Sequence, residues 1–278
     1  MAEITAAMVK ALRERSGLPM MDCKNALQET AGDEEKALEL LRKRGAAAAE
    51  KKAGRATGEG RIGSYVDAAK GVAALAEMQC ETAPVANNPE FKMLADKVAK
   101  HAAVTGTTDV DRIVGEKSVD DPGHTIQDVI HDVLNRIREN MKIARIVRAT
   151  GRAATYVHHN GKIGVMIVVE GQGGDAALLN DLCMHIAALS PLAISREDLP
   201  RDLVAKEEEI AREQIRASGK PESMLEKILT GKMKRWYSEH VLLEQPFVKD
   251  DKQTVGKLLE SAGLKLASFS RIQVGEVS

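Results

Sequence analysis

The most unusual property of this 278-residue sequence is its shortage of aromatic side chains. Three Phe, three Tyr and one Trp make up only 3% of the chain, whereas 44% of its residues are hydrophobic. A core must therefore be built from Ala, Val, Ile, Leu and Met. Because proteins that bind single-stranded nucleic acid stack bases on aromatic rings, this composition argues against such a surface.

A surplus of positive charge is also missing. Lys and Arg total 40 and Asp and Glu total 41, which leaves a net charge of −1. Binding to nucleic-acid phosphates or to an anionic membrane requires extra Lys and Arg, so we expect no direct nucleic-acid binding and no membrane association. The sequence has no run of 18 apolar residues and no apolar signal core near its N-terminus, which favours the cytoplasm.

Cysteine is scarce and unpaired. Cys23, Cys80 and Cys183 are far apart and lack the Cys-x-x-Cys spacing of zinc sites. We expect free thiols in a reducing compartment, no metal and no cofactor. A thiol enzyme that uses Cys80 is an alternative, but its nucleophile would need a His base nearby, and the spacing places none there.

Three other patterns have simple explanations. Adjacent His158 and His159 would point to opposite faces of a strand, so we do not expect them to share a metal ion. Residues 171–174 (Gly-Gln-Gly-Gly) lack the full Gly-x-Gly-x-x-Gly spacing of a phosphate loop. A basic run covers residues 42–44 and 51–55; since cations are favourable at a helix C-terminus, we interpret it as a solvated helix end.

Residues 1–49 predict three short helices. Thr5 can cap the first, Ser16–Pro19 ends it, and the third begins near Asp33. A block of this size has one small core at most, so we interpret it as a docking module. Residues 50–60, rich in Ala, Gly and Lys, are predicted to be a linker.

Residues 61–190 and 241–278 predict a duplicated α+β core. Ser64-Tyr65-Val66 recurs as Thr155-Tyr156-Val157, 91 positions later, and each copy precedes a second apolar strand and then a helix. The predicted architecture is two small antiparallel sheets with flanking helices. The expected elements are strands at 62–66, 71–78, 142–149 and 266–274, a loop at 80–89, and helices at 90–103, 125–140, 176–189 and 255–261.

Residues 191–240 predict an inserted antiparallel helical hairpin. Ser218–Pro221 separates two helices of about 20 residues, or about 30 Å each. The second helix has an apolar stripe that would suit a dimer face or packing within the hairpin. The stripe residues are Leu203, Ile210, Gln214 and Ala217 on the first helix and Met224, Leu225, Ile228, Leu229 and Met233 on the second.

Several motifs resemble those of the bacterial elongation factor Ts family, in the same order over nearly the whole chain. They are residues 12–17 (Leu-Arg-Glu-Arg-Ser-Gly), 20–27 (Met-Met-Asp-Cys-Lys-Asn-Ala-Leu), 77–82 (Glu-Met-Gln-Cys-Glu-Thr), 184–188 (Met-His-Ile-Ala-Ala) and 271–276 (Arg-Ile-Gln-Val-Gly-Glu).

This resemblance implies a fold and a function. The family has a three-helix module similar to ubiquitin-associated domains, a duplicated α+β core and an inserted helical hairpin used in dimerisation. Its members bind the GDP complex of elongation factor Tu and promote exchange of GDP for GTP by loosening Mg²⁺ and phosphate. Such a factor couples two binding equilibria and breaks no bond, so we expect no enzyme activity.

The resemblance also implies which residues bind the partner. Arg13, Met20 and Met21 would dock the N-terminal module, although core packing is the alternative for the two methionines. His185 would face the partner from a core helix, or else be packed inside. The Mg²⁺-displacing loop corresponds to Thr82, Ala83, Pro84, Val85, Ala86 and Asn87.

That loop departs from the family pattern, Thr-Asp-Phe-Val-Ala, in which Asp and Phe wedge into the partner. Ala83 supplies no charge, and Pro84 supplies no aromatic ring and should favour extended geometry at Ala83. Exchange could persist through backbone displacement and the remaining contacts. Alternatively, the protein is a non-catalytic binder or chaperone of elongation factor Tu. Pro19 is a second departure, and many members continue beyond the position of Ser278 into a terminal helix, so we expect a smaller contact area.

Overall fold

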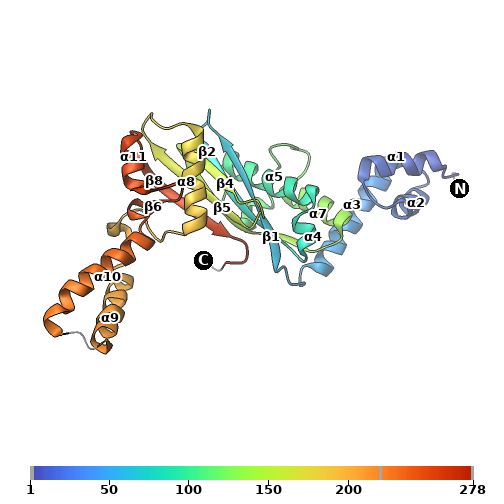
Figure 1. Cartoon of the computed structure of the whole chain (residues 1–278). Coiled ribbons are helices and arrows are strands. Elements are labelled where there is room, and N and C mark those ends of the chain that lie inside the picture. The colour runs from blue at the N-terminus through green and yellow to red at the C-terminus, as the bar shows by residue number, and fades with distance from the viewer. Residues whose placement is uncertain (1–2, 219–220, 277–278) are drawn as a thin grey trace.

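A computed structural model describes residues 3–218 and 221–276. Figure 1 shows an elongated molecule with three parts: a group of helices at the N-terminal end, two sheets with their helices in the middle, and a helical hairpin at the other end. This confirms the predicted α+β class. Within the described ranges, no helix is long and apolar enough to cross a membrane.

The N-terminal part contains the three predicted helices. Thr5 accepts a hydrogen bond from the Met8 N–H, and Asp33 caps the third helix in the same way. The third helix continues to Lys52 and the first strand begins at Glu59, so helix and strand enter the expected 50–60 linker from its two sides; the domain limits themselves stay predictions. The helices are α1 (Ala6–Ser16), α2 (Met20–Glu29) and α3 (Glu34–Lys52).

The middle part contains two antiparallel three-stranded sheets, with strand orders β1-β2-β3 and β4-β5-β8. In each sheet the second strand is central, and the third returns after helical segments. The strands of the first sheet are β1 (Glu59–Asp67), β2 (Val72–Cys80) and β3 (Met141–Thr150). Those of the second are β4 (Arg152–Val157), β5 (Ile163–Glu170) and β8 (Lys265–Gln273).

The strand register confirms the duplication. Tyr65 pairs with Ala74, and Tyr156 pairs with Val165, so both partners are displaced by the same 91 positions. Each central strand also has a bulge toward its third strand, after Glu77 in one sheet and after Val168 in the other, again 91 positions apart. A repeated bulge fixes the register of both sheets in the same way.

The two sheets pack face to face, with helices on their outer faces (Figure 1). Side chains alternate along a strand, so β2 directs Ala74, Ala76 and Met78 toward the first helical layer and Leu75 toward the second sheet. Central strands β2 and β5 are therefore buried on both faces. The covering helices are α5 (Pro89–Thr105) and α7 (Ile126–Ile137) on one side and α8 (Ala176–Leu189) on the other.

One buried carboxylate joins the two sheets. Glu77 on β2 is 2% exposed and accepts hydrogen bonds from the Arg145 guanidinium on β3, from the Gln79 amide and from the backbone N–H of Gly275, just past β8. The Arg145 contact is 2.8 Å. Because a buried charge is costly unless it is paired and hydrogen-bonded, these bonds fix the end of the second sheet against the first.

The predicted loop at 80–89 is wrong in three respects. Cys80 is the last residue of β2, a one-turn helix, α4 (Ala83–Ala86), follows it, and Pro89 begins α5. Helix α4 is too short to show an apolar period. Further elements outside the hairpin are α6 (Val110–Ile113), the short strands β6 (Pro246–Phe247) and β7 (Asp250–Thr254), and α11 (Val255–Ser261), whose range was predicted.

The hairpin consists of α9 (Arg201–Ala217) and α10 (Leu225–His240). Residues 219–220 of the predicted break lie outside the described ranges. Most of the predicted second stripe packs within the hairpin, since Leu225, Leu229 and Met233 are buried against Ala211 and Ile215. Met224 is the exception, because it lies before α10 and is exposed.

The predicted stripe on α9 is wrong by about one residue. Ile210, Gln214 and Ala217 are exposed, whereas Ala211 and Ile215, one position later, face α10. Leu203 instead contacts a small apolar cluster at the base of the hairpin. One residue turns a helix face by about 100°, and this cluster, which the heptad spacing could not reveal, sets the rotation of α9.

Gly63 makes the close contact between β1 and α5 possible. A Cβ at this position would lie 2.1 Å from the carbonyl carbon of Ala95. We expect Gly63→Ala to lower the free energy of unfolding by about 1–3 kcal/mol, because a tightly packed backbone must move. Urea unfolding measures the change. Gly58→Ala, which meets no atom within 4 Å, is the control; equal effects of the two substitutions would contradict the packing argument.

Candidate functional site

The segment from Thr82 to Asn87 forms a capped, exposed turn. Thr82 has an extended backbone (φ −130°, ψ 152°), and its N–H and hydroxyl donate to the Glu139 carboxylate at 3.0 and 2.7 Å. Thr82, Ala83 and Pro84 are exposed, whereas Val85 and Ala86 are buried against the core. The segment therefore presents a fixed tip to solvent.

The expected extended geometry at Ala83 is wrong, because Ala83 begins helix α4. A Pro in the first helical turn is favourable, since the N–H that it lacks would have no partner there. The Asn87 amide donates to the carbonyl of Ala83 at 3.1 Å and closes the turn. The extended residue is Thr82, one position earlier, where the bonds to Glu139 hold it.

The turn after α7 connects this segment to the N-terminal helices. Arg138 has a left-handed backbone (φ 68°), which a non-glycine residue rarely adopts. Its guanidinium donates to the Asp22 carboxylate on α2 at 2.9 Å, and the next residue, Glu139, caps Thr82. Two successive side chains thus reach two segments that are 60 residues apart in the sequence.

Asn140 extends the same set of contacts to the linker. Its backbone N–H donates to the Glu81 carboxylate at 2.6 Å, and its side-chain amide donates to the carbonyl of Arg55 at 2.9 Å. Asn140 is buried. Residues 138–140, which we call the 138–140 turn, therefore fix the N-terminal module, the linker and the 82–87 segment relative to one another.

Arg13, Met20 and Met21 lie on the surface of the N-terminal module. Met20 is 52% and Met21 60% exposed, at the start of α2, and Arg13 is exposed on α1. The core-packing alternative for the methionines is therefore wrong. Exposed, flexible Met side chains are suited to a protein contact.

His185, in contrast, is fully buried. Its Nδ1 accepts the N–H of Val248 at 3.2 Å, so Nε2 carries the proton and donates to the Gln245 oxygen at 2.9 Å. Burial lowers the pKa of His185, partly opposed by the bond to Gln245. The packed alternative thus describes its position: it holds the segment that follows the hairpin, and it is not exposed to a partner.

Comparison with known proteins agrees with the resemblance in the sequence. The family profile described as Elongation factor TS matches residues 81–276. The protein named elongation factor Ts from Methylococcus capsulatus is 45% identical over 98% of this chain and 92% of its own length, and that from Hydrogenovibrio crunogenus is 44% identical over the same shares. The chain belongs to the elongation factor Ts family.

Membership of the elongation factor Ts family makes the chain a translation elongation factor. The relative from Alcanivorax borkumensis, 45% identical over 97% of this chain, bears the same family name. The 138–140 turn was missed in the sequence, because its three contacts join distant segments. The expected helix over 125–140 is wrong for these residues, because α7 ends at Ile137 and Arg138 is left-handed, which nothing in the sequence marks for a non-glycine residue.

The cysteine alternative does not suit this elongation factor Ts chain. Cys80 and Cys183 are buried, and desolvation raises the pKa of each thiol to about 12. A protonated, inaccessible thiol is a poor nucleophile. In the Cys80 case, the thiol donates weakly to the Thr82 carbonyl at 3.4 Å and supports the backbone of the 82–87 segment.

The expectation that His158 and His159 point apart is wrong. Both follow the end of β4, where strand alternation no longer applies, and their ring centroids are 4.2 Å apart. His158 Nδ1 also lies 3.0 Å from the Tyr156 hydroxyl. Among the residues described, no group of three His, Cys, Asp or Glu side chains could hold a metal ion.

The buried His185 predicts an acid-sensitive fold. Its lowered pKa means that the unfolded chain binds the proton more readily, so this contribution to stability is present above about pH 6.5 and is lost as the pH falls below it. We expect His185→Gln to cost about 1–3 kcal/mol at pH 7.5, because hydrogen bonds in a buried site are disrupted.

Urea unfolding of the wild type and His185→Gln at pH 7.5, 6.5 and 5.5 measures both effects. The wild type should lose more stability with acid than the variant. His131, whose pKa burial also lowers, is present in both proteins and cancels in the comparison. Parallel pH profiles would show that His185 does not titrate in this range.

Proposed function

We propose that this chain is a cytoplasmic guanine nucleotide exchange factor: it binds the GDP complex of elongation factor Tu and speeds the replacement of GDP by GTP. The observation that carries the proposal is the capped and exposed 82–87 segment, at the position where the family places its Mg²⁺-displacing loop. Thr82, Ala83 and Pro84 face solvent, while Val85 and Ala86 anchor the segment in the core.

The mechanism is a competition between two binding partners for one elongation factor Tu. Contact of the exposed tip near the Mg²⁺ site would favour a partner conformation that holds Mg²⁺ and phosphate weakly. The tip can weaken GDP binding only to the extent that it binds this conformation of elongation factor Tu more tightly than the GDP-bound conformation. Its rigidity helps, because a segment that is already ordered loses little entropy on binding.

The exposed face of the N-terminal module would supply a second contact through Arg13, Met20 and Met21. The Arg138–Asp22 ion pair and the Glu139–Thr82 bonds originate from neighbouring residues. The two proposed contacts are therefore held at a set spacing before the partner arrives. Two linked contacts bind more tightly than either does alone, provided that their geometry fits the partner.

His185 would act indirectly, by positioning an exposed segment from inside the core. Val248, whose N–H it accepts, is 51% exposed. We propose that the partner contacts the Val248 segment and that His185 positions this segment.

For the hairpin we propose homodimerisation as a separate property, because Ile210 and Met224 are exposed apolar side chains there.

The absent charge and ring at Ala83 and Pro84 favour a second candidate, a binder or chaperone of elongation factor Tu with weak exchange. Both candidates predict a complex, so only rates separate them. The exchange proposal rests on displacement by the backbone of the tip, which the contacts of Thr82 hold in place.

Release of a fluorescent GDP analogue from cognate elongation factor Tu tests the function. We expect saturating amounts of this protein to accelerate release at least about tenfold, which corresponds to about 1.4 kcal/mol of barrier. A complex without acceleration would establish the binder. Absence of a complex by gel filtration would overturn both candidates.

Restoring the family residues tests the tip itself. The double variant Ala83→Asp with Pro84→Phe adds a carboxylate and a ring at exposed positions, so it should fold. We expect a further increase of about tenfold in the rate of GDP release, because aromatic contacts at an interface contribute on the order of 1 kcal/mol or more. Lys97→Ala, an exposed position about two helical turns after the start of α5, is a control. An unchanged rate in the double variant would show that the tip does not reach the nucleotide site.

A further inference from the structure

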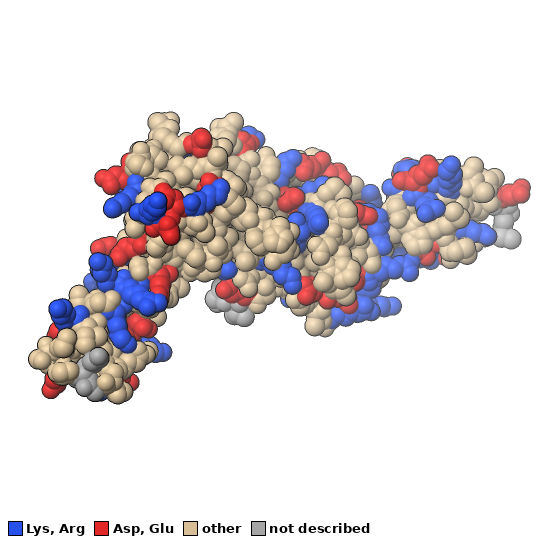
Figure 2. All heavy atoms as spheres, viewed as in Figure 1, with Lys and Arg blue, Asp and Glu red and all other residues tan. Residues whose placement is uncertain are grey.

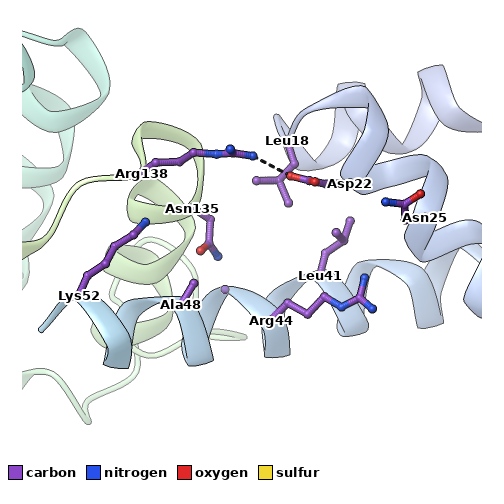
Figure 3. Close-up of a pocket in the computed structure, with 10 residues that line it drawn as sticks. Leu18, Asp22, Asn25, Leu41, Arg44, Ala48, Lys52, Asn135 and Arg138 are labelled. Atoms are coloured by element: carbon purple, nitrogen blue, oxygen red, sulfur yellow. Dashed lines mark hydrogen bonds and ion pairs between the residues drawn. The ribbon is translucent and has the colours of Figure 1, made fainter.

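A cavity of about 360 Å³ lies where the N-terminal module meets the core. Figure 3 shows its walls: α2 on one side, α3 below, and the end of α7 with the 138–140 turn above. Its polar lining consists of Asp22, Asn25, Arg44, Lys52, Asn135 and Arg138. These residues come from three separate stretches of the sequence.

The charges of this lining do not balance. Three cations face one carboxylate, Asp22, which already pairs with Arg138 at 2.9 Å. Arg44 pairs with Glu29, outside the lining. Lys52 is half-buried and has no ion pair with the described residues; desolvation and the neighbouring cations Arg55 and Arg138 lower its pKa, and the Glu81 carboxylate opposes them only in part. A partly buried ammonium group without a hydrogen-bonded anion is unfavourable.

Two unused amides face the same space. The side chains of Asn25 and Asn135 form no hydrogen bond with other described residues, and Figure 3 shows Asn135 pointing down from α7 toward α3, beside Lys52. Gly45 permits this approach, because a Cβ there would lie 1.6 Å from the Asn135 amide nitrogen. An amide NH₂ group can donate two hydrogen bonds to an oxyanion.

We propose that this cavity binds a small phosphate-bearing anion. Arg138 pairs with Asp22 and Arg44 with Glu29, which leaves Lys52 as the lining cation without an ion pair among the described residues, and Lys and Arg side chains gather over this junction in Figure 2. Its volume lies within the usual range for small-molecule sites, about 300–1,000 Å³. Lys52 would supply the charge, the free guanidinium N–H groups of Arg138 a directed contact, and Asn25 and Asn135 the remaining donors.

This site gives the basic run in the sequence a different role. Lys51 is exposed, as a solvated helix end requires, whereas Lys52 turns into the cavity. A bound anion would bridge α3 to the 138–140 turn and to α2. It would therefore hold the N-terminal module on the core more firmly than the Arg138–Asp22 pair does alone.

Isothermal titration of the free protein with inorganic phosphate at about pH 7.5 tests the site, with malonate as the dicarboxylate of the same charge and sodium chloride at matched ionic strength as controls. We expect saturable binding of phosphate and weaker binding of malonate. Lys52→Gln should weaken phosphate binding at least about tenfold. Lys51→Gln, which removes the same charge from the neighbouring exposed position, should leave binding unchanged.

Hydrogen exchange gives a second measurement, in which inorganic phosphate should slow exchange of backbone amides in α2 and around residues 135–140. Equal binding of the two anions would assign the site to dianions in general and overturn the phosphate preference. Heat no greater than that of sodium chloride, or equal losses in both Lys variants, would overturn the site. Since elongation factor Tu is absent, a negative result leaves the exchange proposal unaffected.

Discussion

The bonds of Glu77 determine how the rest of this molecule is assembled. A carboxylate that is almost completely buried must keep all its partners, because loss of any one would leave a charge without compensation. Its partners are Gln79 on its own strand, Arg145 on the last strand of the first sheet and Gly275 just beyond the last strand of the second. The two sheets can consequently slide past each other very little, and the helices on their outer faces inherit a fixed relative position.

That rigid centre separates two surfaces that are positioned by different kinds of contact. On the side of the first sheet, the 138–140 turn positions the 82–87 segment and the N-terminal helices through polar side chains at partly exposed sites. On the side of the second, His185 positions the Val248 segment from inside the core. Exposed polar contacts can exchange with water, whereas the buried His cannot, so the first surface is the more adjustable of the two.

Much of the fold was predictable because local signals agree with the global one. The 91-residue repeat indicated the duplicated sheets. The predicted ranges 176–189 and 255–261 agree with α8 and α11, whose first turns are capped by Asp175 and Thr254. The face of α9 was not predictable, because the cluster at the hairpin base sets its rotation. In the candidate site, the sequence pattern could not decide whether Met20 and Met21 are exposed or buried. The contacts of Arg138 and the cavity beside it depend on residues that meet only after folding.

The position of β8 has a consequence for synthesis of the chain. The first sheet is complete once Thr150 has been made, whereas the second needs Lys265–Gln273, nearly at the end. The N-terminal half can therefore acquire its sheet on the ribosome while nearly half of the chain is still to be added. Until then β5 keeps an unpaired edge, which in the finished protein β8 occupies. The late arrival of one strand makes the second half of the duplicated core the vulnerable one during translation.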